Sequence, residues 1–81
     1  MRVTVRLFAR LKELAGAETM VVEVDEPATV AMVWRAATVI APALNPFERA
    51  ISCAVNANFS RMSHAVSDGD DVAFLPPVSG G

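Results

Sequence analysis

Apolar and polar side chains alternate over the first residues of the chain. Every second residue from Val3 to Leu7 is apolar, and the residues between them are threonine or arginine. A period of two is typical of a β-strand that buries one face, so we expect a strand over Arg2–Phe8. By the same parity, Phe8 lies on the solvent side of that strand.

Two segments have apolar residues at helical spacing instead. The shorter one, Ala9–Ala15, is followed by Gly16, a residue that commonly ends helices. The longer one begins after Thr29, whose hydroxyl can accept a hydrogen bond from a free N–H of the first turn. It ends before Pro42, because the residue preceding a proline is disfavoured in the helical conformation. The apolar stripe of this main helix consists of Val30, Val33, Trp34, Ala37 and Ala41.

Further extended segments are predicted at 19–24, 51–55 and 72–75, and a short one begins at Phe59. We expect a loop over residues 42–50, which contain two prolines and an asparagine. Cys53 falls on the inward side of its strand, and we interpret it as a small core residue. One main helix beside several strands predicts a two-layer α+β domain.

The outward side of the last strand suggests a recognition surface. Val72 and Phe74 share the inward face, which leaves Leu75 on the outward face. Phe8 is outward by its own parity, and Phe59 can join the two from the short extended segment. Three large apolar side chains on a solvent-facing sheet would form an unusual patch for so small a domain. We therefore expect a partner protein to bind there.

The chain ends in a glycine pair behind two prolines. Pro76 and Pro77 have no N–H donors and favour an extended backbone, so they cannot continue a central strand. We therefore expect a domain over 1–75 and a flexible tail over 76–81, in which Val78 and Ser79 lead to Gly80 and Gly81. Six extended residues reach at most about 20 Å. Because glycine has no Cβ, such a tail can enter a slot that side chains would block.

A terminal carboxylate at Gly81 would have to be activated before it could react. It is negatively charged and resonance-stabilised, so it is a poor electrophile at neutral pH, and adenylation is the most direct activation. The sequence has no phosphate-binding glycine loop and no arrangement typical of a catalytic triad. We therefore expect the chain to be non-catalytic alone and to depend on an activating partner that uses ATP.

Composition narrows the classes of partner. The 81 residues are 53% hydrophobic, and seven basic side chains stand against nine acidic ones without a basic run. This balance gives no reason to expect nucleic-acid binding. No stretch approaches the roughly 20 apolar residues of a membrane span, and the first residues lack the apolar core of a secretion signal. With one cysteine and no possible internal disulfide, we expect a cytoplasmic protein.

Two polar features are interpreted as structural. His64 lies outside the tail and has no evident acidic partner in the sequence, so we expect packing or a surface hydrogen bond rather than proton transfer. The aspartates around Gly69 lack the spacing of a calcium-binding loop, so we expect a solvated turn. Neither feature predicts a bound metal or cofactor.

The sequence as a whole resembles the small, sulfur-carrier subunits of molybdopterin synthase, a family with the ubiquitin-like β-grasp fold. The most specific likeness is the ending from Asp68 to Gly81, which the family commonly has as Asp-Gly-Asp-Glu-Val-Ala-Phe-Phe-Pro-Pro-Val-Thr-Gly-Gly. This chain differs there by Asp71, Leu75 and Ser79. The shorter matching segments are Leu7-Phe8-Ala9, Glu13 to Gly16, Pro27 with Thr29-Val30, and Ala54-Val55-Asn56.

The resemblance implies a fold with a mixed sheet packed on one main helix, and a reaction cycle. An E1-like enzyme would adenylate Gly81, and a sulfurtransferase or cysteine desulfurase system would convert it to a thiocarboxylate. Two carriers would then each give one sulfur to cyclic pyranopterin monophosphate, which builds the dithiolene of molybdopterin. The family's catalytic side chains, an essential lysine included, lie on the large subunit of a 2:2 heterotetramer. Its apolar contacts match Phe8, Phe59 and Leu75, and the tail Pro76, Pro77, Val78 and Ser79 would enter the partner.

Three alternatives stay open at this point. Another β-grasp sulfur carrier could feed thiamine, cysteine or tRNA thiolation. A ubiquitin-like protein modifier would end in an isopeptide bond to a lysine of its target and would yield conjugates of higher mass. A plain interaction domain would tolerate the loss of Gly80 and Gly81.

Overall fold

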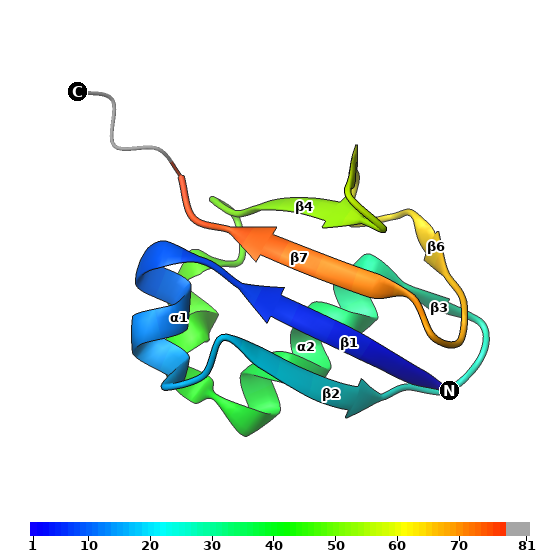
Figure 1. Cartoon of the computed structure of the whole chain (residues 1–81), viewed down its shortest axis with the longest axis horizontal. Coiled ribbons are helices and arrows are strands. Elements are labelled where there is room, and N and C mark those ends of the chain that lie inside the picture. Colours follow the sequence, from blue (N-terminus) through cyan, green and yellow to red (C-terminus); the bar gives the residue numbers. More distant parts are fainter. Residues whose placement is uncertain (78–81) are drawn as a thin grey trace.

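The computed structural model describes residues 1–77, in which a main helix packs against one face of a sheet (Figure 1). The sheet has five strands in the order β2-β1-β7-β4-β5, and a separate two-stranded ladder pairs β3 with β6. The mixed sheet and its helix confirm the predicted α+β, β-grasp fold. The elements are β1 (Arg2–Leu7), α1 (Ala9–Ala15), β2 (Thr19–Glu23), β3 (Ala28–Thr29), α2 (Val30–Ile40), the 3₁₀ helix η1 (Pro42–Phe47), β4 (Ser52–Val55), β5 (Asn58–Ser60), β6 (Ala65–Val66) and β7 (Asp71–Leu75).

The first and last strands of the domain pair with each other at the centre of the sheet. β1 and β7 are parallel, with Leu7 opposite Phe74, whereas the other pairs of this sheet are antiparallel. Both strands therefore end at the same edge of the sheet, next to α1 (Figure 1). This arrangement brings Phe8, which follows β1, to the place where the chain leaves β7.

The core lies between α2 and the inner face of the sheet. All five residues of the predicted helical stripe are buried, as are the inward residues of β1 and β7. The ring of Trp34 packs edge-on against Phe74, with the two centroids 4.9 Å apart and the ring planes at 64°. Aromatic pairs favour this geometry over face-to-face stacking. The contact ties the main helix directly to the last strand of the sheet.

Gly16 ends α1 as predicted. Its backbone is left-handed, with φ of 69°, and its N–H donates to the carbonyl oxygens of Lys12 and Glu13 at 3.0 and 3.3 Å. A residue without a Cβ adopts this conformation at little cost, and the hydrogen bonds satisfy carbonyls that the helix leaves unpaired.

The start of α2 differs from the prediction. Thr29 occupies the N-cap position, but its side chain makes no capping hydrogen bond. The free N–H groups of Val30 and Ala31 donate instead to the backbone oxygens of His64 and Met62, at 3.0 and 2.9 Å. The β3–β6 ladder holds these distant segments together, and a two-residue strand has no periodicity by which the sequence would have shown it.

Residues 42–50 are not simply a loop. Pro42–Phe47 forms the 3₁₀ helix η1, and its Leu44 is fully buried against the core. The prediction was wrong here because prolines and an asparagine are typical of loops, and a single buried leucine sets up no helical pattern. A proline within the first turn is nevertheless compatible with a helix, since its missing N–H is not needed there.

The turn between β4 and β5 contains two residues with left-handed backbones. Asn56 has φ of 49° and Ala57 has φ of 70°. Asparagine tolerates this region, whereas an alanine Cβ crowds the following carbonyl oxygen at a cost of roughly 1–2 kcal/mol. Glycine is the residue that such hairpin turns prefer.

We therefore expect Ala57→Gly to stabilise the domain by about 0.5–1 kcal/mol, because relief of the crowding outweighs the added flexibility of glycine. For a domain of this size the unfolding midpoint should rise by a few degrees. Trp34, the only tryptophan, reports unfolding by fluorescence. The matched control is Ala36→Gly within α2, which should lower the free energy of unfolding by about 1 kcal/mol. A lower midpoint for Ala57→Gly would contradict the assignment of strain.

Candidate functional site

The edge where β1 and β7 end is the first part of the candidate site. Phe8 follows β1 directly, and 43% of its surface is exposed. The parallel register pairs Leu7 with Phe74, so Phe8 follows in step with Leu75, which is half-buried. Pro76 is half-buried and Pro77 is exposed as the chain leaves this edge. Pro76 and Pro77 therefore follow β7 at the edge of the sheet where Phe8 and Leu75 lie.

A sharp change of backbone direction holds Phe8 in place. Its own backbone is extended, while the next residue, Ala9, is left-handed with φ of 50°. The carbonyl oxygen of Phe8 accepts the N–H of Leu11 at 3.1 Å and so begins α1. Because the strand ends and the helix begins within two residues, the position of Phe8 is fixed from both sides.

The second part of the site is the outward side of β7, β4 and β5. Ala73 lies opposite Ala54, and Ala54 lies opposite Phe59, so the three form one row across the strands. Cross-strand partners project to the same face of a sheet. Phe59 is 81% exposed, which is extreme for an aromatic ring. We call the surface of Phe8, Phe59, Ala73 and Leu75, with the largely covered Ala54 between Phe59 and Ala73, the outer sheet face.

The three apolar side chains predicted from parity are therefore all at least partly accessible on the side of the sheet opposite α2. Their role as partner contacts stays a prediction. The sequence analysis did not single out Ala54 and Ala73, which lie between the larger residues of the face. Only the strand register reveals them, because nothing local distinguishes these alanines from those of the core.

An ion pair that was not predicted from the sequence borders the outer sheet face. Nε of Arg6 lies 2.6 Å from Oδ2 of Asp71, and the two side chains are 50% and 34% exposed. Arg6 is opposite Ala73 in the register, whereas Asp71 is opposite Thr4, so the pair crosses β1 and β7 diagonally. A positive charge thus lies next to the apolar row.

The turn before β7 is organised by side-chain hydrogen bonds. The carboxylate of Asp70 accepts the backbone N–H of Ser67 at 2.8 Å and Nδ2 of Asn56 at 3.1 Å. Oδ1 of Asn56 in turn accepts the backbone N–H of Asp71 at 3.0 Å. The hydrogen bond from Ser67 is the first cause, and that from Asn56 the second, of a lowered pKa for Asp70. The predicted solvated turn is thus an ordered hydrogen-bonded one.

His64 lines a cavity of about 340 Å³ beside this turn, together with Asp70 and Phe59. Its backbone N–H donates to Arg61 and its carbonyl oxygen accepts the N–H of Val30. The residue therefore helps to hold the start of α2 through its main chain. No acidic partner for His64 was evident in the sequence, but the fold places this residue near Asp70, and its charge contributes to the lowered pKa of that carboxylate. The structural role of the His64 side chain stays a prediction.

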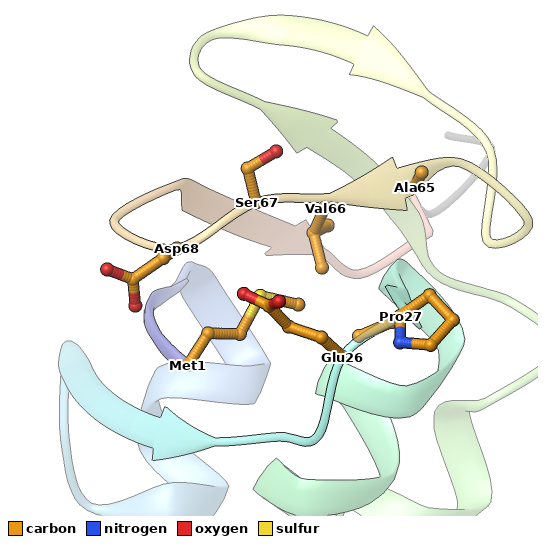
Figure 2. Close-up of a pocket in the computed structure, with 8 residues that line it drawn as sticks. Met1, Glu26, Pro27, Ala65, Val66, Ser67 and Asp68 are labelled. Atoms are coloured by element: carbon orange, nitrogen blue, oxygen red, sulfur yellow. The ribbon is translucent and has the colours of Figure 1, made fainter.

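A larger cavity of about 460 Å³ lies at the opposite end of the sheet, where β1 and β7 begin (Figure 2). Met1, Pro27 and Val66 are among the eight residues that line it, between β6 and the segment that joins β2 to β3. The amino group of Met1 donates to the carbonyl oxygen of Val24 at 2.8 Å. The length of the strands separates this cavity from the edge at which the chain leaves β7.

Cys53 has the structural role expected of it. The residue is 3% exposed, and Sγ lies 3.3 Å from the carbonyl oxygen of Ser60 on the neighbouring strand. Burial raises the pKa of the Cys53 thiol, so the reactive thiolate form is disfavoured.

Four predicted site residues, Val78, Ser79, Gly80 and Gly81, lie outside the described residues. Among residues 1–77, no group of three or more His, Cys, Asp and Glu side chains is arranged to hold a metal ion. No helix in the same range is both long and apolar enough to cross a membrane.

Comparison with known proteins identifies the family. A model of the ThiS family matches residues 5–81. The sulfur carrier subunit of molybdopterin synthase from Escherichia coli is 36% identical over 80 residues, which cover 98% of this chain and 99% of that protein. The crystal structure of SAMP1 from Haloferax volcanii is also similar, with a TM-score of 0.88 and 34% sequence identity. The alignment covers 100% of this chain and 100% of the SAMP1 chain.

A third similarity concerns an assembly. The complex of subunits 1 and 2 of the molybdopterin-converting factor from Helicobacter pylori contains a chain similar to this one, with 26% sequence identity and a TM-score of 0.69. The alignment covers 100% of both chains. This chain therefore belongs to the ThiS family and is a ubiquitin-like protein of the sulfur-carrier type.

The hydrogen bonds to Asp70 predict a pH-dependent stability. They favour the ionised carboxylate and lower its pKa in the folded state below the ordinary value of 3.8. The stabilisation is therefore fully present above that value and is lost as the pH falls through the lower folded-state pKa. We expect Asp70→Asn to be less stable than the wild type at pH 7, and the two unfolding midpoints to converge in acid.

The control is Asp25→Asn, since Asp25 is exposed and makes no side-chain hydrogen bond among residues 1–77. This variant should follow the wild type at both pH values. A difference between Asp70→Asn and the wild type that stays constant into acid would refute the electrostatic explanation.

Proposed function

We propose that this ThiS-family chain is the sulfur-carrier subunit of a molybdopterin synthase and presents sulfur as a thiocarboxylate on Gly81. The observation that supports this most directly is the full-length similarity to the Escherichia coli sulfur carrier subunit. The geometry is compatible with it, because the central strand β7 brings the chain out beside the exposed Phe8. A domain that docks beside its own reactive end is what a carrier needs.

The chemistry begins with activation of the carboxylate. In the active site of an E1-like enzyme, an oxygen of Gly81 attacks the α-phosphorus of ATP, and pyrophosphate leaves. A persulfide sulfur supplied by a sulfurtransferase or cysteine desulfurase system then attacks the acyl carbon, and AMP leaves. A thiol reductant cleaves the resulting sulfur–sulfur bond and leaves the thiocarboxylate. The glycyl adenylate and the thiocarboxylate are thus transient states of this chain, which holds no cofactor of its own.

The large subunit of the synthase consumes the thiocarboxylate. Two carriers in turn each give one sulfur to cyclic pyranopterin monophosphate, and the dithiolene of molybdopterin forms. The catalytic side chains lie on the large subunit, so this chain contributes Gly81 as its reacting group and Gly80 for clearance. The Helicobacter pylori complex of two molybdopterin-converting factor subunits supports such a partner. We propose a 2:2 assembly in the cytoplasm.

The domain and the tail have separate roles, partner binding and delivery of the reacting group. Phe8, Phe59 and Leu75 on the outer sheet face bind the partner, and residues 76–79 pass into its active site. Exposed aromatic side chains are among the residues that contribute most to protein–protein affinity. Because the same domain can stay docked while its end reacts, the reaction becomes effectively intramolecular.

A second candidate function is protein modification, favoured by the similarity to the Haloferax volcanii SAMP1 structure at 34% identity. The relative of this name from Haloferax volcanii is called small archaeal modifier protein 1. A modifier would be adenylated in the same way, but a lysine amine of the target would then attack the acyl carbon. Conjugates of higher mass in extracts, absent when Gly81 is deleted, would distinguish this function from sulfur delivery.

The sulfur-carrier function predicts a defined change of mass. Incubation with ATP, an E1-like activating enzyme and a sulfur source should convert the chain to a species in which one oxygen is replaced by sulfur. Intact-mass spectrometry measures the change, and the chain without Gly81 should not show it. An unchanged mass, with an activating enzyme proven on another carrier, would contradict the proposal.

The docking role of the outer sheet face predicts a difference between two equally exposed residues. Phe59 on β5 and Val39 on α2 are both 81% exposed, but only Phe59 lies on the outer sheet face. Phe59→Ala should weaken binding to the synthase large subunit about tenfold or more, the range of interface hot spots. Val39→Ala should leave binding within about twofold. Titration calorimetry measures both, and equal affinities would argue against this docking surface.

A further inference from the structure

The ion pair of Arg6 and Asp71 lies where the apolar part of the outer sheet face ends. The register places Arg6 beside Ala73, which is followed across the sheet by Ala54 and Phe59. A partner that covers the apolar row would therefore reach Arg6 at its border. Interfaces commonly have an apolar centre with polar residues around it, and arginine is enriched in them.

The guanidinium of Arg6 is only partly used within the chain. Nε binds Asp71, and neither of its two terminal nitrogens makes a hydrogen bond to any of residues 1–77. A guanidinium has five N–H donors in one plane, and four of them belong to these terminal nitrogens. Since half of the side chain is exposed, this edge is accessible from the outside.

Asp71 fixes the direction of that edge. The bond to Nε, at 2.6 Å, orients the plane of the guanidinium, and Asp71 is itself held by Asn56 through its backbone N–H. An ordered arginine loses less side-chain entropy on binding than a mobile one. The unused donors are thus arranged before the partner arrives, and they match the geometry of a carboxylate that accepts two parallel hydrogen bonds.

We propose that Arg6 is a specificity-determining residue of this surface, and that its terminal nitrogens bind a carboxylate side chain of the synthase large subunit. The inference rests on the proposed function, because it assigns chemistry to the partner of that same surface. The large subunit would discriminate between carriers by the charge at this position in addition to the apolar contacts. Burial of the unused donors without an acceptor would cost affinity, so a partner with an apolar residue there would bind less well.

The chain contains a matched control for this claim. Arg2 forms an equivalent ion pair, with its Nε 3.1 Å from Oε1 of Glu23, on the same side of β1. Arg2 lies at the beginning of β1, at the far end from Phe8 and the end of β7. Both pairs link neighbouring strands and are solvent-exposed, so a change to either should have little effect on the stability of the fold.

The test compares two double variants that exchange the charges of a pair, Arg6→Asp with Asp71→Arg and Arg2→Glu with Glu23→Arg. Affinity for the large subunit encoded in the same genome is measured by titration calorimetry at low and at high salt. We expect the exchange at Arg6 and Asp71 to weaken binding at least tenfold, and that at Arg2 and Glu23 to weaken it less than twofold. Arg6→Ala should weaken binding about tenfold and also reduce its dependence on salt, since a charged contact is lost. Trp34 fluorescence should show similar unfolding midpoints throughout.

Two contrary results are distinguishable. If the wild type binds the large subunit and the exchange at Arg6 and Asp71 binds equally well, the role of Arg6 is refuted while the proposed function stands. If the wild type forms no complex with the large subunit, the proposed function itself fails, and the inference about Arg6 fails with it.

Discussion

The parallel pairing of β1 with β7 is the constraint on which the rest of the structure depends. It places the first and last strands side by side in the middle of the sheet, so that both end at one edge. Phe8 and Leu75 both follow the last register pair there, and the ion pair of Arg6 and Asp71 spans the same two strands. The inner side of β7 is fixed as well, because Phe74 packs on Trp34 of the main helix. Pro76 therefore follows directly on a strand that is paired on both sides and packed on the core.

Local periodicity was sufficient to predict the elements that bury a whole face. The alternation in β1 and the stripe of α2 both correspond to residues that are buried in the structure, and Gly16 ends its helix as expected. The pairs that involve distant segments could not be predicted in this way. The hydrogen bonds from the start of α2 to His64 and Met62 depend on a two-residue ladder, which is too short to show a pattern.

In the candidate site too, residues marked by local periodicity could be predicted, whereas relations between distant segments could not. Parity identified Phe8 and Leu75 as outward residues, and the exposure of both agrees with it. Parity could not show that Arg6 is diagonal to Asp71, or that Ala54 and Ala73 lie between the larger apolar residues, because these relations depend on the register between strands. Asn56 carries no local pattern that predicts its contacts, yet its amide joins the β4–β5 turn to the beginning of β7. Side chains that organise contacts far apart in the sequence leave no local signal.

The proposed function requires that the outer sheet face binds the partner while the reaction takes place at the end of the chain. Its most direct test is a titration of the ¹⁵N-labelled carrier with the synthase large subunit, followed by amide chemical shifts. We expect the largest changes within residues 1–77 on β7 and β5 and at Phe8, whereas the amides of Val39 and Ile40 on α2 should stay unchanged. Changes concentrated on α2, with the outer sheet face unaffected, would contradict it.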